Sequence, residues 1–208
     1  MGLYDRYVLP WVLHLGCSSP PIAKQREKVV PKAKGVILEV GMGTGLNIPF
    51  YNPALVERVY GLEPAPEMRK RAEPAANRAS FPVDFIELPG EEIPLEDDSV
   101  DTVVLTFTLC TIPDAMKALK GMKRVLKPDG TLLFCEHGLA PDPGVVRWQN
   151  RLNGIWHACA GGCNLNRDIP SLIREAGFKI TDLHTLYLPN TPKVAGYNYW
   201  GMARIAVS

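Results

Sequence analysis

Three glycines follow an apolar run in the first quarter of the chain. Residues 36–40 read Val-Ile-Leu-Glu-Val, and Gly41, Gly43 and Gly45 stand at alternate positions after them. Glycine permits a tight turn and lets a ligand lie directly against the backbone. Parallel α/β sheets bind their ligands at the carboxyl ends of the strands. The spacing therefore predicts a ligand-binding loop at the end of a strand.

A carboxylate suited to the same ligand follows the next apolar run. Glu63 ends a predicted strand, where it can accept hydrogen bonds from both hydroxyls of a ribose. The dinucleotide fingerprint G-x-G-x-x-G needs a glycine where Leu46 stands, and Gly45 comes one place early. The pattern favours a ribose-bearing ligand and disfavours a dehydrogenase.

The elements that must position these groups alternate along the chain. Helical patterns near 65–79 and 114–127 separate apolar, β-rich runs near 35–40, 57–62, 82–87, 101–107 and 131–136. This βαβ order is typical of a parallel sheet that is covered by helices on both faces. Further along, the pattern predicts a helix near 168–176, closed by Gly177, and strands near 178–187 and 197–206.

Length and composition bound the class of protein. A chain of 208 residues, 46% hydrophobic and 22% charged, is predicted to form a single domain over 1–208. Its net charge of +1 gives no field that would attract nucleic acid. No apolar run reaches the roughly 18 residues of a membrane span, and an odd count of 5 cysteines predicts thiols rather than a disulfide framework. We expect a cytoplasmic protein.

The pattern Glu39-x-Gly41-x-Gly43-x-Gly45, followed by Glu63 and by residues 90–101, resembles class I S-adenosylmethionine-dependent methyltransferases. In these enzymes the third segment lies beside adenine, although Pro89 stands here where many relatives have Asp. The resemblance implies a Rossmann-like fold with a mostly parallel, seven-stranded sheet, and S-adenosylmethionine as cofactor, with S-adenosylhomocysteine as its product. It assigns the cofactor to Glu39, Gly41, Gly43, Thr44, Gly45, Asn47, Glu63, Pro64, Gly90, Glu91, Glu92, Thr106 and Leu109.

Other motifs concern the methyl acceptor. Signatures for methylating bases and a catechol-type magnesium site are missing. Instead, Leu109-Cys110, Glu136-His137, Trp148-Gln149 and Gly162-Cys163-x-Leu165-x-Arg167 resemble the methyltransferase-like protein 7 family of thiol S-methyltransferases and its small bacterial relatives. The resemblance departs at the front, where the animal members begin with a membrane-inserting helix that residues 1–16 are too short to replace. It implies a small thiol as substrate.

The aromatic and apolar segments outside the βαβ series are expected to cover the acceptor. Residues 1–33 form an N-terminal helical lid, in which Pro10 separates two short helices, and residues 34–208 form the core with a lid insertion near 141–167. Weak contact of the front segment with a membrane surface is compatible with this pattern. The sequence does not fix the oligomeric state.

A thiol acceptor reacts as its thiolate, so a modest base suffices. His137 is the candidate base, oriented by Glu136 or sharing a proton with it; alternatively His137 only caps the strand end and Glu136 bonds backbone. His14 and His157 are second candidates.

The spacing His157-x-Cys159-x-x-x-Cys163 suggests zinc, but Cys17, Cys110 and Cys135 lie on other elements, and we predict no metal site. Two other functions stay open: phosphatidylethanolamine or other small-molecule N-methylation, and cofactor binding without turnover.

Overall fold

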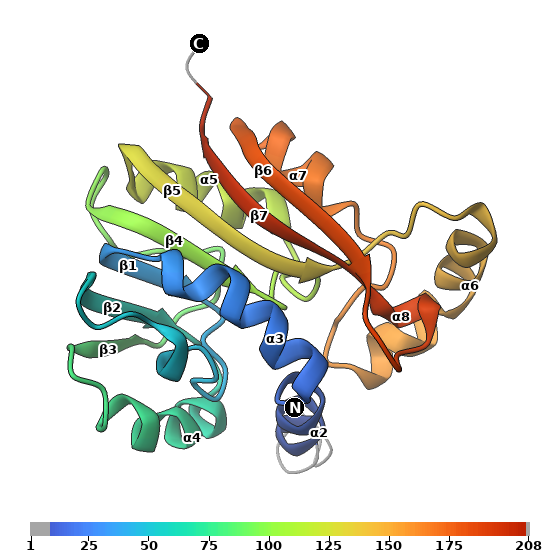
Figure 1. Ribbon diagram of the computed structural model, residues 1–208, viewed down its shortest axis with the longest axis horizontal. Coiled ribbons are helices and arrows are strands. Elements are labelled where there is room, and N and C mark those ends of the chain that lie inside the picture. The colour runs from blue at the N-terminus through green and yellow to red at the C-terminus, as the bar shows by residue number, and fades with distance from the viewer. Residues whose placement is uncertain (1–8, 207–208) are drawn as a thin grey trace.

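The computed structural model describes residues 9–206, so residues 1–8 of the predicted helical lid lie outside the described residues. A seven-stranded sheet runs through the middle in the order β3-β2-β1-β4-β5-β7-β6 (Figure 1). Its strands are β1 (Gly35–Val40), β2 (Val56–Leu62), β3 (Val83–Ile86), β4 (Val100–Thr106), β5 (Leu126–His137), β6 (Phe178–Tyr187) and β7 (Tyr197–Ile205). Within residues 9–206 the strands pair in parallel, except that β7 pairs antiparallel with both β5 and β6. The predicted fold class is confirmed.

The glycine loop lies at the switch point of this sheet. The chain runs outward from β1 through β2 to β3, and then returns to the other side of β1 as β4 and β5. Ligands of open α/β sheets bind at the carboxyl ends of strands on either side of such a point. The ends of β1, β2 and β4 therefore meet at one edge, as the sequence predicts.

Helices cover both faces of the sheet. On one face α3 (Pro20–Val29) packs against β5 and β7, and α4 (Pro66–Ala76) lies near β2 and β3 (Figure 1). On the other face lie α5 (Ala115–Val125) and α7 (Ile169–Glu175), which contact β5 and β6 respectively. A separate buried apolar cluster fills the space on each face. This explains why the strands read as continuous apolar runs.

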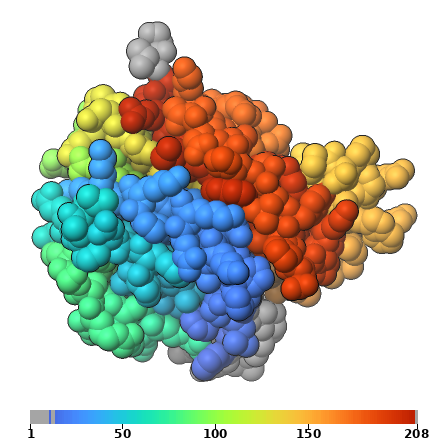
Figure 2. Space-filling view, in the orientation of Figure 1, coloured from blue at the N-terminus to red at the C-terminus, as the bar shows by residue number. Residues whose placement is uncertain are grey.

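The front of the described chain is helical. α2 (Leu9–Cys17) begins one residue before Pro10, and a proline in the first turn lacks only an N–H that would have no intrahelical partner. α3 follows it after two residues, and Figure 2 shows this blue segment between the cyan and green atoms and the orange and red atoms. Residues 9–29 are therefore largely helical, as predicted, whereas the predicted helical piece before Pro10 lies outside the described residues.

The segment 141–167 contains a long helix that the sequence pattern did not predict. α6 (Pro143–Cys159) projects beyond the sheet beside α8 (Lys193–Gly196), as Figure 1 shows. Trp148 and Ile155, which lie two turns apart on this helix, remain exposed. No helix within residues 9–206 is long and apolar enough to cross a membrane.

Candidate functional site

The glycine loop and Glu63 form one unit. Gly41, Gly43 and Gly45 all have left-handed backbone conformations, with φ values of +70°, +58° and +76°. A side chain at Gly43 would meet only the Gly41 carbonyl oxygen, at 4.0 Å, so its backbone is open to a ligand. The Gly43 N–H donates to Oε2 of Glu63 over 2.9 Å, which fixes the carboxylate beside the loop.

A pocket opens next to this unit, at the carboxyl ends of β1, β2 and β4. Among the residues predicted to bind the cofactor, its walls include Gly41, Glu63, Pro64, Gly90 and Glu91. Pro89, Thr108, Thr111 and Ile112 complete much of the remaining wall. The carboxylate suits a ribose, the bare glycine backbone suits a charged tail, and the apolar rim suits a flat base. These residues therefore fit S-adenosylmethionine. Direct contact with it stays a prediction for each residue.

The other predicted cofactor residues lie outside that lining. Glu39, Asn47 and Thr106 are buried behind the loop, and Arg26 joins them. Its Nη1 donates to Asn47 Oδ1 over 2.8 Å and to Thr106 Oγ1 over 2.7 Å. The Glu39 carboxylate accepts from Asn47 and from Tyr51, and burial raises its pKa to about 7. This network supports the shape of the loop, and no motif in the sequence indicates that Arg26 takes part.

Thr44 connects the glycine loop to the front of the chain. Its hydroxyl lies 2.8 Å from Nδ1 of His14 on α2. The Arg71 guanidinium of α4 stacks on Trp11, 4.0 Å from the ring centre. The first contact holds α2 against the glycine loop, and the second holds it against α4. His14, predicted as a second candidate base, is a contact of the loop in this structure.

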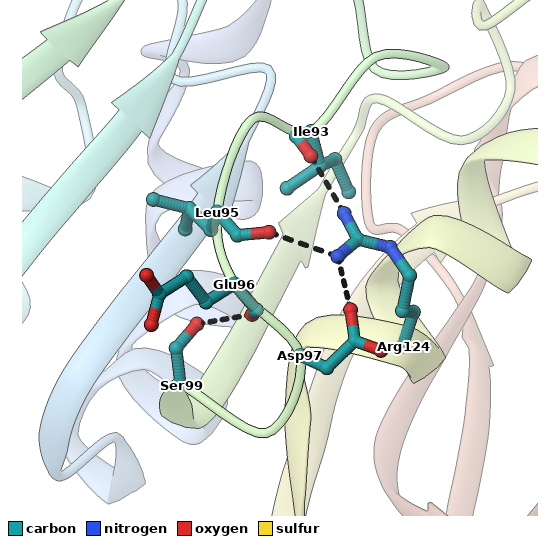
Figure 3. A network of polar contacts seen from close by, with 6 residues as sticks. All are labelled: Ile93, Leu95, Glu96, Asp97, Ser99 and Arg124. Carbon is teal, nitrogen blue, oxygen red and sulfur yellow. Dashed lines mark hydrogen bonds and ion pairs between the residues drawn. The ribbon is translucent and has the colours of Figure 1, made fainter.

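Residues 90–101, which the resemblance predicts to lie beside adenine, contain no helix, and one arginine of α5 holds them in place (Figure 3). Arg124 donates from Nη2 to the Ile93 carbonyl over 2.7 Å and from Nη1 to the Leu95 carbonyl over 2.9 Å. Nη1 also pairs with Asp97 at 2.5 Å. Glu91, at the start of this segment, accepts a hydrogen bond from the backbone N–H of Asp114, the N-cap of α5. Glu92 is exposed, and Leu109 is buried away from the pocket lining.

Replacing Arg124 with Ala should weaken cofactor binding. Carbonyls at residues 93 and 95 would lose their donor, and the segment would move more freely before it could meet a base. Because Arg124 is partly exposed, we expect a modest loss of about three- to tenfold in affinity. Titration calorimetry measures it, with Lys120→Ala on the same helix as the matched control. Equal affinities for the two variants would contradict this role.

Glu136 organises the loop after β4. Phe107 adopts a left-handed conformation (φ +55°) just after the strand, and the chain turns so that three successive amides reach one carboxylate. Glu136 accepts from Thr108 N at 2.8 Å, Leu109 N at 3.0 Å and Cys110 N at 3.4 Å. Burial raises the pKa of Glu136, and these amides oppose that rise.

The expected hydrogen bond between Glu136 and His137 is not formed. Consecutive residues of a strand point to opposite faces, so Glu136 turns toward residues 108–110 while His137 turns away. Nε2 of His137 lies 2.9 Å from Sγ of Cys163. The prediction that Glu136 directly orients the imidazole by a hydrogen bond is therefore wrong. The alternative, that Glu136 accepts hydrogen bonds from the backbone, is confirmed.

The structure brings Cys110 to Cys163, with 3.6 Å between the sulfurs. The sequence predicts no metal site because Cys110, like Cys17 and Cys135, lies on another element than Cys163. His157 and Cys159, which the sequence spacing grouped with Cys163, are not part of this group of donor atoms. The hydrogen bond that Cys163 donates to Cys110, together with burial, raises the pKa of Cys163. We name Cys110, His137 and Cys163 the thiol–imidazole cluster.

A family model, curated relatives and a solved structure match this chain. The family described as "Methyltransferase domain" matches residues 38–134. The human thiol S-methyltransferase TMT1A is 34% identical over 176 residues, covering 80% of this chain and 71% of that protein. A phosphatidylethanolamine N-methyltransferase of Cereibacter sphaeroides is 30% identical over 134 residues, covering 60% and 64%. The crystal structure of a putative methyltransferase from Bacillus halodurans has a TM-score of 0.71 at 16% identity, covering 89% of this chain and 98% of the other.

Proposed function

The chain belongs to the class I S-adenosylmethionine-dependent methyltransferases, and on that premise we propose that its methyl acceptor is the sulfur of a small thiol. The observation that carries the proposal is the thiol–imidazole cluster, in which side chains from three motifs that resemble thiol S-methyltransferases come together from distant parts of the sequence. One of them, Cys110, stands next to Thr111 of the pocket wall. Similarity to a thiol S-methyltransferase over 80% of the chain supports the same substrate class.

When bound, S-adenosylmethionine supplies a methyl group on a positively charged sulfur. The protein has to hold that group, align an acceptor and keep water away. In our proposal Glu63 takes the ribose hydroxyls, the glycine loop holds the charged tail, and Thr108 and Thr111 face the reacting end from the β4 loop. His137 keeps its predicted role as base only if its contact with Cys163 opens, because that sulfur occupies Nε2.

A product assay tests the acceptor. Purified protein with S-adenosylmethionine is offered alkyl thiols, hydrogen sulfide, primary amines and phosphatidylethanolamine vesicles, and the products are identified by mass spectrometry. We expect methyl thioethers from the thiols and little product from the amines. Methylation confined to amines or lipid would reject the thiol.

The lipid amine is a second candidate for a specific reason. Large apolar side chains stand exposed on two helices outside the sheet, namely Trp11 and Leu15 on α2 and Trp148, Ile155 and Trp156 on α6. Such residues could rest on a lipid surface. The vesicle arm of the product assay distinguishes this acceptor from a dissolved thiol.

Opening the front helix should slow turnover more than it weakens cofactor binding. In the double variant Trp11→Ala/His14→Ala, α2 loses its contacts with Arg71 and Thr44, so water should reach the pocket more easily. We expect kcat to fall roughly tenfold, in line with a loss of about 1.4 kcal/mol. Leu15→Ala, which removes an exposed side chain from the same helix, is the control. Full activity in the double variant would show that α2 is not a lid.

A further inference from the structure

We propose that Cys110, His137 and Cys163 are the three protein ligands of a zinc-type metal site, and that its open fourth position binds the sulfur of the acceptor. The second part rests on the proposed thiol acceptor, whereas the first part does not. Two thiols and an imidazole are the donors that Zn²⁺ prefers, and three protein ligands are typical of catalytic rather than structural zinc.

The donor atoms have the separations that a small tetrahedral ion needs. With Zn–S near 2.3 Å and Zn–N near 2.0–2.1 Å, tetrahedral angles place two sulfurs roughly 3.8 Å apart and a sulfur and nitrogen roughly 3.5 Å apart. The cluster has 3.6 Å between sulfurs and 2.9 Å between Nε2 and the Cys163 sulfur. All three donors lie within 4.8 Å of one another. To reach these values the His137–Cys163 pair would have to open by about half an ångström, and the His137–Cys110 pair, at most 4.8 Å apart, would have to settle near 3.5 Å.

The backbone that carries the donors is held by bonds that do not involve them. Asn164 donates to the Cys110 carbonyl from its backbone N over 2.9 Å and from Nδ2 over 3.0 Å. Arg167 donates to the carbonyls of Leu109 at 2.5 Å and Ile112 at 2.7 Å. The loop after α6 is thus fastened to the loop after β4. A site that is assembled before its ion arrives binds that ion with less ordering cost.

A partner for the other nitrogen of His137 stands across the sheet. Asn198 of β7 is the register neighbour of His137 on β5, and its side chain is fully buried. Within the described residues, neither the Asn198 amide nor Nδ1 of His137 has a hydrogen-bond partner. Directly opposed residues of a strand pair are close enough for such side chains to meet. A small rotation would let Nδ1–H donate to Asn198, the outer contact that metal-binding histidines usually have.

Coordination would supply the nucleophile. A thiol RSH that enters the open position gives its proton to solvent and stays bound as RS⁻, since metal binding deprotonates thiols. A lone pair of that sulfur then forms the bond to the methyl carbon. The methyl–sulfonium bond breaks, and its electron pair remains on the cofactor sulfur as S-adenosylhomocysteine. The neutral thioether RSCH₃ is a weaker ligand and leaves, so no oxidant or reductant is required.

The place of the cluster fits this use. Cys110 lies between Thr108 and Thr111, and both of these line the cofactor pocket. Cys17 is the last residue of α2, the helix that contacts the glycine loop through His14. A fourth protein ligand from Cys17 would close the site, so this cysteine is included in the test.

Metal binding is measured first, without any substrate. The full chain, reduced with a phosphine and stripped with a chelator, is titrated with Co²⁺, which reports tetrahedral thiolate coordination by its visible and near-ultraviolet bands, and then with Zn²⁺. We expect one ion per chain. Cys110→Ser, Cys163→Ser and His137→Gln should each weaken binding by more than roughly a hundredfold, and Asn198→Ala by roughly ten- to a hundredfold. Cys159→Ser, exposed at the end of α6, should change nothing. No bound ion in the folded, reduced wild-type chain overturns the proposal, even if a variant fails to fold.

The open position is tested on the Co²⁺ protein. A small alkyl thiol should shift the bands, and Cys17→Ser should leave them unchanged. Bands that respond to Cys17→Ser but not to the thiol overturn coordination of the acceptor. Equal thiol methylation by stripped and zinc-loaded protein also overturns it, while the proposed thiol acceptor stands. If the protein methylates only amines, the thiol acceptor fails, yet the ion count is untouched.

Discussion

Glu63→Gln should weaken the binding of S-adenosylmethionine by tenfold or more. Glu63 stands at the end of β2 with one oxygen on the Gly43 N–H and the other, at 3.0 Å, on the Ala65 N–H. Its position lets the same oxygens accept from a ribose. Hydrogen bonds to a charged group contribute about 1.5–3 kcal/mol, and the neutral amide keeps only one accepting oxygen. Calorimetry with Glu57→Gln, a change on the exposed part of the same strand, gives the comparison.

The pH dependence of that affinity provides a second readout. Burial raises the pKa of Glu63 above its usual value, opposed by the two backbone N–H groups and by Arg69. Above this pKa the carboxylate can accept two hydroxyl bonds; as pH falls through it, protonation removes the charge and affinity should decrease. The Gln variant has no proton to gain at this site. Its deficit relative to wild type should therefore shrink toward acid pH, and a constant deficit would count against the ribose role.

Glu136→Ala should nearly abolish activity and lower the stability of the fold. The carboxylate is fully buried, and its removal leaves the amides of Thr108, Leu109 and Cys110 without an acceptor. Each orphaned donor costs about 1–3 kcal/mol, so the sum is a large part of the 5–15 kcal/mol typical of a domain. Chemical denaturation gives the loss of unfolding free energy, and steady-state kinetics the loss of kcat.

Glu136→Gln is the matched variant. Its single oxygen can still accept from Thr108 and Leu109, whereas its amide group would face the Cys110 N–H. We expect an intermediate stability and a partial loss of rate. If Glu136→Gln lost all activity while remaining as stable as wild type, the carboxylate would have a chemical role beyond holding the loop.

Local patterns in the sequence determined the parallel core and its ligand-binding edge. An apolar run followed by alternate glycines can only end a buried strand in a tight turn, and Glu63 ends the next strand for the same reason. Gly177 terminates α7 with a φ of +89°, as its position predicted. These features depend on backbone preferences within a few residues, which is why a single sequence contains them.

The acceptor side was decided by tertiary structure. Cys110, His137 and Cys163 come from three loops and strand ends, so their spacing along the chain says nothing of their distance in space. Arg26 reaches the glycine loop from a helix 21 residues before Asn47, and Glu136 faces away from its neighbour because strand side chains alternate. Sequence motifs named most of these residues but misjudged what each one touches. Contacts between distant segments form only when the sheet order is set, and that order is fixed by the packing of all seven strands together.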